Sequence, residues 1–114
     1  MSIADRVMKV AFADEHVKKA YEKLKSGRTE EKQLLAFLER AIEDLKIDPF
    51  CAITVPSKQW PKEYVKKYGV DNLMKYDLPN GWRLIYTVRG NEIEIISILL
   101  EWLDHKNYNR KFKY

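Results

Sequence analysis

Apolar and polar positions alternate most regularly between residues 72 and 100. Three runs rich in β-branched and aromatic residues are separated there by Asn80-Gly81 and Gly90-Asn91. Asn and Gly adopt the positive φ angles that tight two-residue turns require, and such dipeptides between apolar runs are typical of hairpins. The pattern therefore predicts a three-stranded antiparallel meander.

Two-residue turns also determine the expected register of this meander. In the first hairpin they place Leu78 opposite Arg83, and in the second they place Arg83 opposite Ile98. Arg83 is then expected in the central strand, with an apolar neighbour on each side. A solvated surface does not readily explain a guanidinium at such a position.

The N-terminal half predicts one strand and two helices. Residues 6–13 read as the strand, and Asp14 is placed to cap a helix that ends at Gly27. Apolar residues then recur every three to four positions beyond Thr29, which we expect to cap a second helix that stops before Pro49. Helices joined by so short a link form a hairpin, and their apolar stripes need the sheet as a partner.

The connector between the helical hairpin and the meander mixes aromatic and basic residues. Residues 50–55 fit a short extended piece, and Pro61 begins a short helix that ends at Gly69. The lysines of the connector are Lys58, Lys62, Lys66, Lys67 and Lys75, and its aromatic residues include Trp60, Tyr64 and Tyr68. Such a mixture binds phosphates and stacks bases, or it packs an amphipathic helix on the core. We expect the aromatic residues to pack and the lysines to contact phosphate.

Charge is unevenly divided along the chain. Residues 1–48 carry ten basic and ten acidic side chains, whereas residues 49–114 carry eleven basic and seven acidic ones, so the whole net charge of +4 lies in the second half. Its last part, residues 102–112, is expected to form a helix or an extended tail. A basic half suits an anionic partner, nucleic acid first, although a solvated basic face would have the same composition.

Length and composition indicate a single α+β domain over residues 1–114, in which an N-terminal strand and a helical hairpin pack on an antiparallel meander, followed by a short C-terminal helix or tail. The sequence has no apolar run of about 18 residues and no signal-peptide pattern, so we expect a cytoplasmic protein without a membrane partner. Cys51 has no disulfide partner and is expected to be a buried small hydrophobe. With only His16 and His105, no metal site or other cofactor is expected.

The chemistry that remains is carried by Arg83, His105 and Tyr108. RNA can be cleaved without metal because its 2′-OH is the nucleophile, and the protein has to stabilise charge on the phosphate and move protons. A guanidinium binds phosphate oxygens in a bidentate manner, and a histidine exchanges protons near neutral pH. The tyrosine could donate a proton or stack a base.

Each of these residues also has a purely structural interpretation. The arginine could pair with Glu94 or Glu101, the histidine could be an ordinary surface residue, and the tyrosine could cap the core. Arg89, in contrast, is expected to pair across the strands with Glu92 at the tip of the second hairpin.

Taken together, these residues resemble the RelE/ParE toxin superfamily. The order of strand, helical hairpin, loop and meander is similar, and residues 78–88 resemble the superfamily's strand motif of aromatic residue, arginine, two aliphatic residues and tyrosine. His105-Lys106-x-Tyr108 is similar to the C-terminal pattern of several members. The resemblance implies a toxin of a type II toxin–antitoxin pair. Members such as RelE, YoeB and HigB cut mRNA in the ribosomal A site, without metal, by 2′-OH attack on the adjacent phosphate.

The resemblance also implies roles and partners. Arg83 matches the phosphate-binding arginine, while His105 and Tyr108 match the residues of acid–base chemistry and base stacking. The expected RNA-binding residues are Lys106, Arg110, Lys111, Lys66, Lys67 and Lys58. The implied partners are a cognate antitoxin, the ribosome and mRNA, and the implied assembly is a homodimer or a toxin–antitoxin hetero-oligomer.

One departure from the RelE pattern leaves a second function open. Glu101-Trp102 stands where RelE-like members often carry a basic residue, and Glu101 could act as the base instead. The alternatives to a nuclease are a non-catalytic ParE-like inhibitor of a topoisomerase and a module that only binds an antitoxin or RNA.

Overall fold

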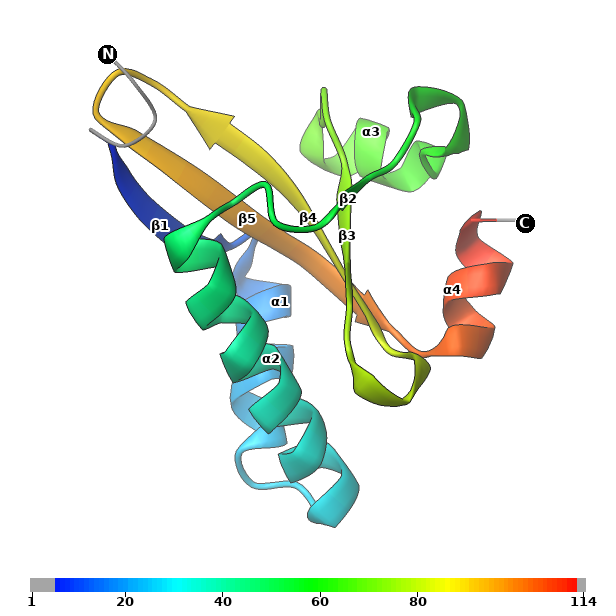
Figure 1. Ribbon diagram of the computed structural model, residues 1–114. Coiled ribbons are helices and arrows are strands. Elements are labelled where there is room, and N and C mark those ends of the chain that lie inside the picture. Colours follow the sequence, from blue (N-terminus) through cyan, green and yellow to red (C-terminus); the bar gives the residue numbers. More distant parts are fainter. Residues whose placement is uncertain (1–5, 113–114) are drawn as a thin grey trace.

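A computed structural model describes residues 6–112, which form one five-stranded sheet with helices on both faces (Figure 1). The strands are β1 (Val7–Phe12), β2 (Ile53–Thr54), β3 (Met74–Asp77), β4 (Arg83–Gly90) and β5 (Glu94–Leu103). The helices are α1 (Glu15–Leu24), α2 (Thr29–Ile47), α3 (Lys62–Tyr68) and α4 (His105–Phe112), with 3₁₀ turns at Ser57–Gln59 and Pro79–Gly81. The predicted α+β fold is confirmed, and the C-terminal segment is a helix.

The strand order is β1-β5-β4-β3-β2. β1 runs parallel to β5, and the other neighbours are antiparallel, as the meander predicts. The pairing of β1 with β5 places the N-terminal strand at the edge opposite β2. Within residues 6–112, no helix is both long enough and apolar enough to cross a membrane.

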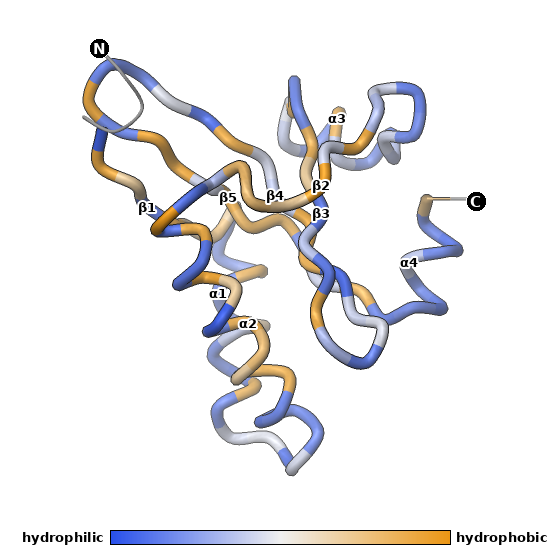
Figure 2. The backbone as a smooth tube through the Cα atoms, in the orientation of Figure 1, coloured by the Kyte–Doolittle hydropathy of each residue, from blue (hydrophilic) through white to orange (hydrophobic). Residues whose placement is uncertain are grey.

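The two faces of the sheet carry separate cores. On one face the stripe of α2, including Leu38 and Leu45, packs against Leu84 of β4 and Leu99 of β5. On the other face α3 and α4 pack against residues that alternate with these, such as Ile85. The apolar positions of α2, β4 and β5 can be followed in Figure 2. Burial on both sides explains why the central strands are almost continuously apolar.

The helix boundaries follow the capping residues with one correction. Asp14 caps α1, since its Oδ1 accepts a hydrogen bond from Val17 N at 2.9 Å. The N-cap of α2 is Arg28 and not Thr29, which is already helical, and no side chain caps this end. Pro61 is the N-cap of α3 and not its first helical residue, whereas Gly69 ends the helix as expected, in the left-handed conformation.

The first hairpin has a three-residue loop, so the expected register is wrong by one residue. Leu78 N donates to Trp82 O at 2.8 Å, and Asn80 takes a positive φ of 61° between them. Asp77, and not Leu78, therefore faces Arg83. Because side chains alternate between faces, this shift decides which residue lies beside the guanidinium.

The second hairpin departs further from expectation because Asn91 organises a longer loop. Its Oδ1 accepts hydrogen bonds from the backbone N atoms of Ile93 and Glu94, and its own N donates to Glu94 O. Between Ile85 and Tyr86 of β4 the register shifts once more, because β5 contains one additional residue opposite this point. Arg83 consequently pairs with Leu103 and not with Ile98.

The connector after α2 contains a second correction. Cys51 is exposed and not buried, because the chain between α2 and β2 runs over the surface and buries Pro49 instead. The aromatic residues of the connector pack as expected: Tyr64 is buried, and Trp60 and Tyr68 lie against the same core.

Asn72 extends the pairing of β3 with β4 through its side chain. Its Nδ2 donates to Val88 O, and its Oδ1 accepts from Val88 N, both at 2.8 Å. The Thr87 hydroxyl donates to the Asn72 carbonyl at 2.8 Å. The amide thus acts as a substitute for a backbone unit where the strand ladder ends.

We expect Asn72→Ala to lower the free energy of unfolding by about 1–3 kcal/mol, because two partly buried backbone groups of Val88 lose their partners. Asn72→Asp should also destabilise the fold, since a carboxylate oxygen would then face the Val88 carbonyl. Urea unfolding measures both changes. Asn109→Ala on exposed helix surface is the control, with an expected change within about 0.5 kcal/mol. A fully stable Asn72→Asp protein would contradict this account.

Candidate functional site

Arg83 and Tyr108, two of the three expected catalytic residues, are in contact at the end of the sheet. The Cζ atom of Arg83 lies 5.3 Å from the centroid of the Tyr108 ring. Lys75, on β3, places its Nζ 5.2 Å from the same centroid. This contact exists because β5 continues to Leu103 and α4 begins two residues later. From the sequence, Lys75 was expected only to contact phosphate, as one of the connector's lysines. Its contact with the Tyr108 ring depends on the register of the sheet, which the sequence alone does not give.

Tyr108 itself belongs to the core. Its side chain is 2% exposed and stacks on Phe112, with ring centroids 4.5 Å apart and an angle of 25°. Tyr108 and Phe112 are four positions apart in α4, so both lie on the same face of the helix, which packs against the sheet. The surroundings of Tyr108 therefore match its structural interpretation, an aromatic residue that caps the core.

Arg83 is held by the turn that precedes it. Its Nη1 donates to Gly81 O at 2.8 Å and to Trp82 O at 3.3 Å. Its Nε lies 3.0 Å from Asp77 Oδ1, an ion pair although Nε donates no hydrogen bond in this geometry. The side chain is 19% exposed. The ion-pair partner is thus Asp77 and neither Glu94 nor Glu101, because the first hairpin is shifted by one residue.

His105 is exposed at the first position of α4. Its Nε2 lies 3.2 Å from Asn109 Nδ2 on the next helical turn. A Cβ atom added to Gly81 would lie 3.2 Å from the Cβ of His105, so the helix begins close against the first hairpin turn. Asp104 fixes this start, since its Oδ1 accepts from Asn107 N at 2.8 Å. The structure therefore brings His105 to the turn that also holds Arg83.

Lys111 anchors α4 to the sheet and to α3. Its Nζ lies 2.7 Å from Glu101 Oε2 and 2.9 Å from a carboxylate oxygen of Glu63, and its side chain is 18% exposed. The Tyr64 hydroxyl donates to the same Glu101 oxygen at 2.7 Å. An expected RNA-binding lysine is therefore engaged inside the protein, and the alternative base Glu101 accepts two hydrogen bonds.

The ionisation of this cluster follows its burial. Burial, and then the neighbouring Glu101 carboxylate, raise the pKa of Tyr64 far above its usual value. Burial lowers the pKa of Lys111, but its bonds to Glu101 and Glu63 outweigh this effect and the net pKa is raised. Lys111 is consequently a permanent cation, and Tyr64 remains a neutral donor.

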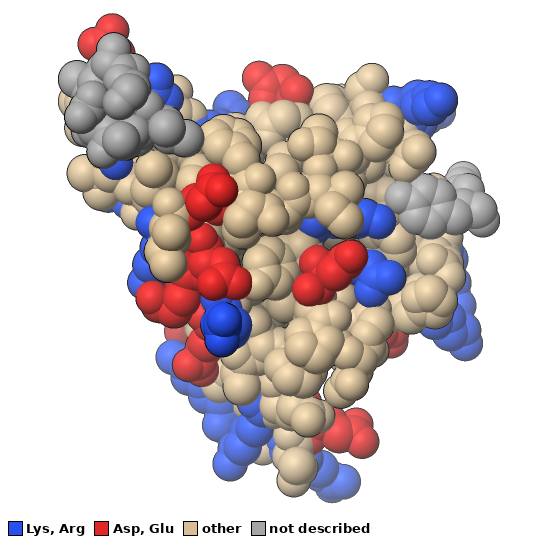
Figure 3. Space-filling view, viewed as in Figure 1, with Lys and Arg blue, Asp and Glu red and all other residues tan. Residues whose placement is uncertain are grey.

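The other expected RNA-binding residues divide into two groups. Lys58, Lys66, Lys106 and Arg110 are exposed. Lys67 is half-exposed, with its Nζ 3.6 Å from Asp14 Oδ2 and 5.3 Å from the centroid of the Tyr68 ring. Blue side chains project at the α3–α4 end of the molecule in Figure 3. We call the exposed residues of α3 and α4, with Lys66, Lys106 and Arg110 among them, the α3–α4 surface.

Arg89 does not pair across the hairpin with Glu92. Its Nη2 donates to the carbonyls of Gly69 at 3.0 Å and of Tyr68 at 3.3 Å. The guanidinium therefore binds the C-terminal end of α3, where carbonyl groups lack helical partners and favour a cation. The longer second loop explains the error, because it moves Glu92 out of the ladder.

Lys111 offers a test of the difference between a structural and an exposed cation. Lys111→Met should lower the free energy of unfolding by about 1–3 kcal/mol, because Glu101 and Glu63 lose a partly buried partner. Lys106→Met removes the same charge from the exposed side of α4 and should change stability by less than about 0.5 kcal/mol. Urea unfolding distinguishes the two, and equal effects would contradict the structural role of Lys111.

The described residues have no arrangement suited to a metal. Between residues 6 and 112, no three His, Cys, Asp or Glu side chains lie close enough together to hold a metal ion. The chemistry of the α3–α4 end is therefore described by its arginine, lysine, histidine and tyrosine side chains.

Comparison with known proteins identifies the family. The sequence model described as the ParE toxin of the type II toxin–antitoxin system parDE matches residues 12–100, from the end of β1 to β5. No curated protein and no solved structure gave a match. The expected RelE/ParE superfamily is confirmed, and a type II toxin has a cognate antitoxin as its partner. The chain belongs to the ParE toxin family of type II toxin–antitoxin systems.

Proposed function

We propose that this toxin acts as a ParE-like inhibitor that blocks a topoisomerase by binding to it, and that it does not cut RNA. The observation that carries the proposal is the state of the three candidate catalytic side chains. Tyr108 is buried, Arg83 is bound by its own turn, and His105 alone among the three is exposed. The family description supports the same choice.

Metal-independent RNA cleavage demands more than this arrangement offers. A base, an acid and a cation must all reach one accessible phosphodiester. The ring of Tyr108 is covered by Phe112, and the Nη1 atom of Arg83 is already shared between two carbonyl oxygens. Moving either group to a substrate would cost packing or hydrogen bonds that help to hold α4 and the first hairpin.

The charge of the α3–α4 surface suits a target that contains nucleic acid. Lys66, Lys106 and Arg110 are all exposed, and their positive charge attracts phosphate at long range. A topoisomerase on DNA and a translating ribosome both present such phosphates. The charge therefore suits either target, and the burial of Tyr108 and the internal contacts of Arg83 are what support the topoisomerase.

A ribosome-dependent mRNA endonuclease is the second candidate. It is favoured by the concentration of Arg83, Lys75 and His105 around one end of the sheet, next to Tyr108. In that function Arg83 would stabilise the phosphate, and His105 and Tyr108 would carry out acid–base chemistry and base stacking. The ribosome would have to rearrange Tyr108, because apo geometries can tighten or change in the productive complex.

Induction in cells separates the two functions. We expect the wild-type toxin to activate a DNA-damage reporter before amino-acid incorporation falls, because a blocked topoisomerase leaves DNA lesions. His105→Ala, a change at an exposed side chain, should keep full toxicity. A triple variant, Lys66→Glu, Lys106→Glu and Arg110→Glu, should lose most toxicity while retaining its circular dichroism spectrum, since it reverses the charge of the α3–α4 surface.

Toeprinting on translating ribosomes tests the second candidate function, cleavage of mRNA. We expect no cleavage product with the wild-type chain. Cleavage by the wild type that disappears in His105→Ala, or in a folded Arg83→Ala protein, would establish the nuclease and overturn the proposed inhibition by binding.

A further inference from the structure

Three large apolar side chains are exposed between the last residue of α2 and the first residue of β2. Ile47 is 78% exposed, Phe50 is 52% exposed and Ile53 is 50% exposed. Single apolar side chains on a surface are ordinary, but Ile47 and Ile53 line the same pocket and form a patch that marks a contact area. This patch lies at the end of α2 opposite the helical hairpin's own turn (Figure 1).

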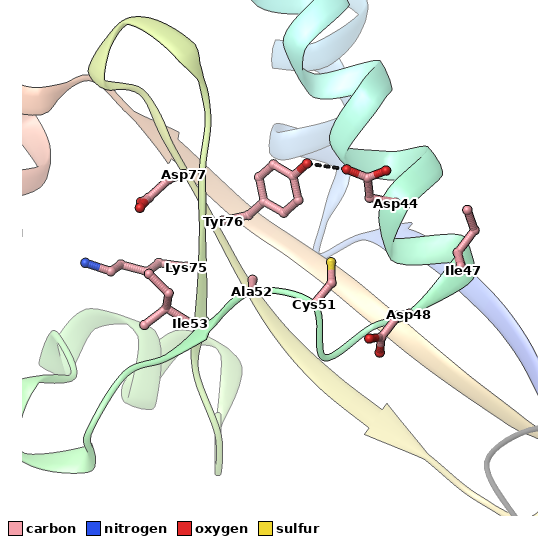
Figure 4. A pocket seen from close by; sticks show the side chains of 9 residues that line it. All are labelled: Asp44, Ile47, Asp48, Cys51, Ala52, Ile53, Lys75, Tyr76 and Asp77. Atoms are coloured by element: carbon pink, nitrogen blue, oxygen red, sulfur yellow. Dashed lines mark hydrogen bonds between the residues drawn. The ribbon is translucent and has the colours of Figure 1, made fainter.

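The patch borders a pocket of about 430 Å³ (Figure 4). The C-terminal end of α2 forms one wall, with Asp44 and Ile47, and β3 forms the other, with Lys75 and Asp77. The connector between them supplies the base, including Cys51. We call this pocket, with the exposed Ile47 and Ile53 in its lining, the α2–β3 groove; Phe50 lines a different hollow.

The groove is acidic in a protein that is basic overall. Asp44, Asp48 and Asp77 line it, against a single basic residue, Lys75. Acidic side chains gather over the C-terminal end of α2 in Figure 3. The carboxylates are held in place: Asp44 accepts from the Tyr76 hydroxyl and pairs with the exposed Arg40, whose Nε lies 3.5 Å from Asp44 Oδ1. Asp48 accepts from Phe50 N at 2.9 Å. A fixed acidic rim beside apolar side chains favours a partner with basic and apolar residues.

The groove also contains an edge of the sheet. β2 is the last strand in the order, pairs with β3 through Ile53 and Thr54 alone, and is only two residues long. An edge strand presents backbone groups to which another extended segment can add. Main-chain pairing at this edge would bring the side chains of such a segment over Ile53.

We propose that the α2–β3 groove binds a segment of the cognate antitoxin that places apolar side chains against Ile47 and Ile53 and a lysine or arginine between Asp44 and Asp48. The occupant is chosen by charge complementarity and by the antitoxin that family membership implies.

The position of the groove also suggests how the antitoxin would neutralise the toxin. The groove shares Asp77 and Lys75 with the candidate site, where Asp77 pairs with Arg83 and Lys75 lies over Tyr108. A segment bound in the groove would therefore reach the α4 end of the sheet and limit access to it. This consequence rests on the proposed function, whereas the binding itself rests on family membership alone.

The test is binding of the full chain to the product of the reading frame next to its gene, measured by calorimetry on purified proteins. Ile47→Glu and Ile53→Glu should each weaken binding by about tenfold or more, because a carboxylate would face an apolar partner beside an acidic rim. Ile93→Glu, at an equally exposed residue in the second hairpin, is the matched control and should change the affinity by less than about twofold.

The charge is tested separately. Asp48→Asn keeps an oxygen that can accept from Phe50 N but removes the charge, so it should weaken binding of the antitoxin and reduce the salt dependence of that binding. Asp71→Asn, on the exposed chain before β3, is the control and should change neither the affinity nor its salt dependence. Unchanged affinity in both isoleucine variants would overturn the proposal. So would a neighbouring product that fails to bind the wild type, or light scattering that shows a dimer of this chain dissociated by Ile47→Glu. None of these readouts depends on toxicity, so failure here is distinct from failure of the proposed function.

Cys51 supplies a second readout because it is the only cysteine in the chain and lines the groove. Partial desolvation of the sulfur, and then the Asp48 and Asp44 carboxylates, raise the pKa of this exposed residue's thiol, so iodoacetamide should react more slowly with the folded chain than with the urea-unfolded chain. The bound antitoxin should slow alkylation by a further factor on the order of ten, and Ile53→Glu should remove this protection at the same protein concentrations. An alkylation rate that the antitoxin leaves unchanged would contradict binding in the groove.

Discussion

The pairing of β4 with β5 determines where Arg83, His105 and Tyr108 lie relative to one another. Because the second hairpin has a long loop and β5 takes one additional residue opposite Ile85 and Tyr86, β5 ends beside the first residue of β4. The chain then turns directly into α4 next to Arg83. A different register would leave the same residues on the same elements but would separate the arginine from the tyrosine.

Filling both faces of the sheet has a chemical consequence. α2 covers one face, and the short helices α3 and α4 cover the other with the aromatic rings of Tyr64, Tyr108 and Phe112. Aromatic side chains remove much apolar surface from water, which stabilises a domain of this size. The same packing withdraws the Tyr64 and Tyr108 side chains from solvent, so neither ring lies open to a substrate on the second face.

Local patterns predict the elements of this fold well, and long-range pairing accounts for the errors. The helical hairpin, the meander and the short helix before Gly69 all follow from periodicity, caps and turn residues close in sequence. The registers do not, because loop conformations at Asn80 and Asn91 decide them. The partners of Lys111 are distant in sequence, on α3 and β5, so no local pattern indicates that this lysine is engaged.

Lys111 has one more consequence, which concerns the entropy of binding. By joining α4 to α3 and β5 through Glu63, Glu101 and the Tyr64 hydroxyl, it turns a charged C-terminal segment into part of a rigid body. A free basic tail would lose many conformations when it met its target, and each ordered residue would reduce the net affinity. Here that ordering has already occurred during folding. In the proposed function, Lys106 and Arg110 would therefore meet the target at a fixed spacing, so that its shape as well as its charge would be recognised.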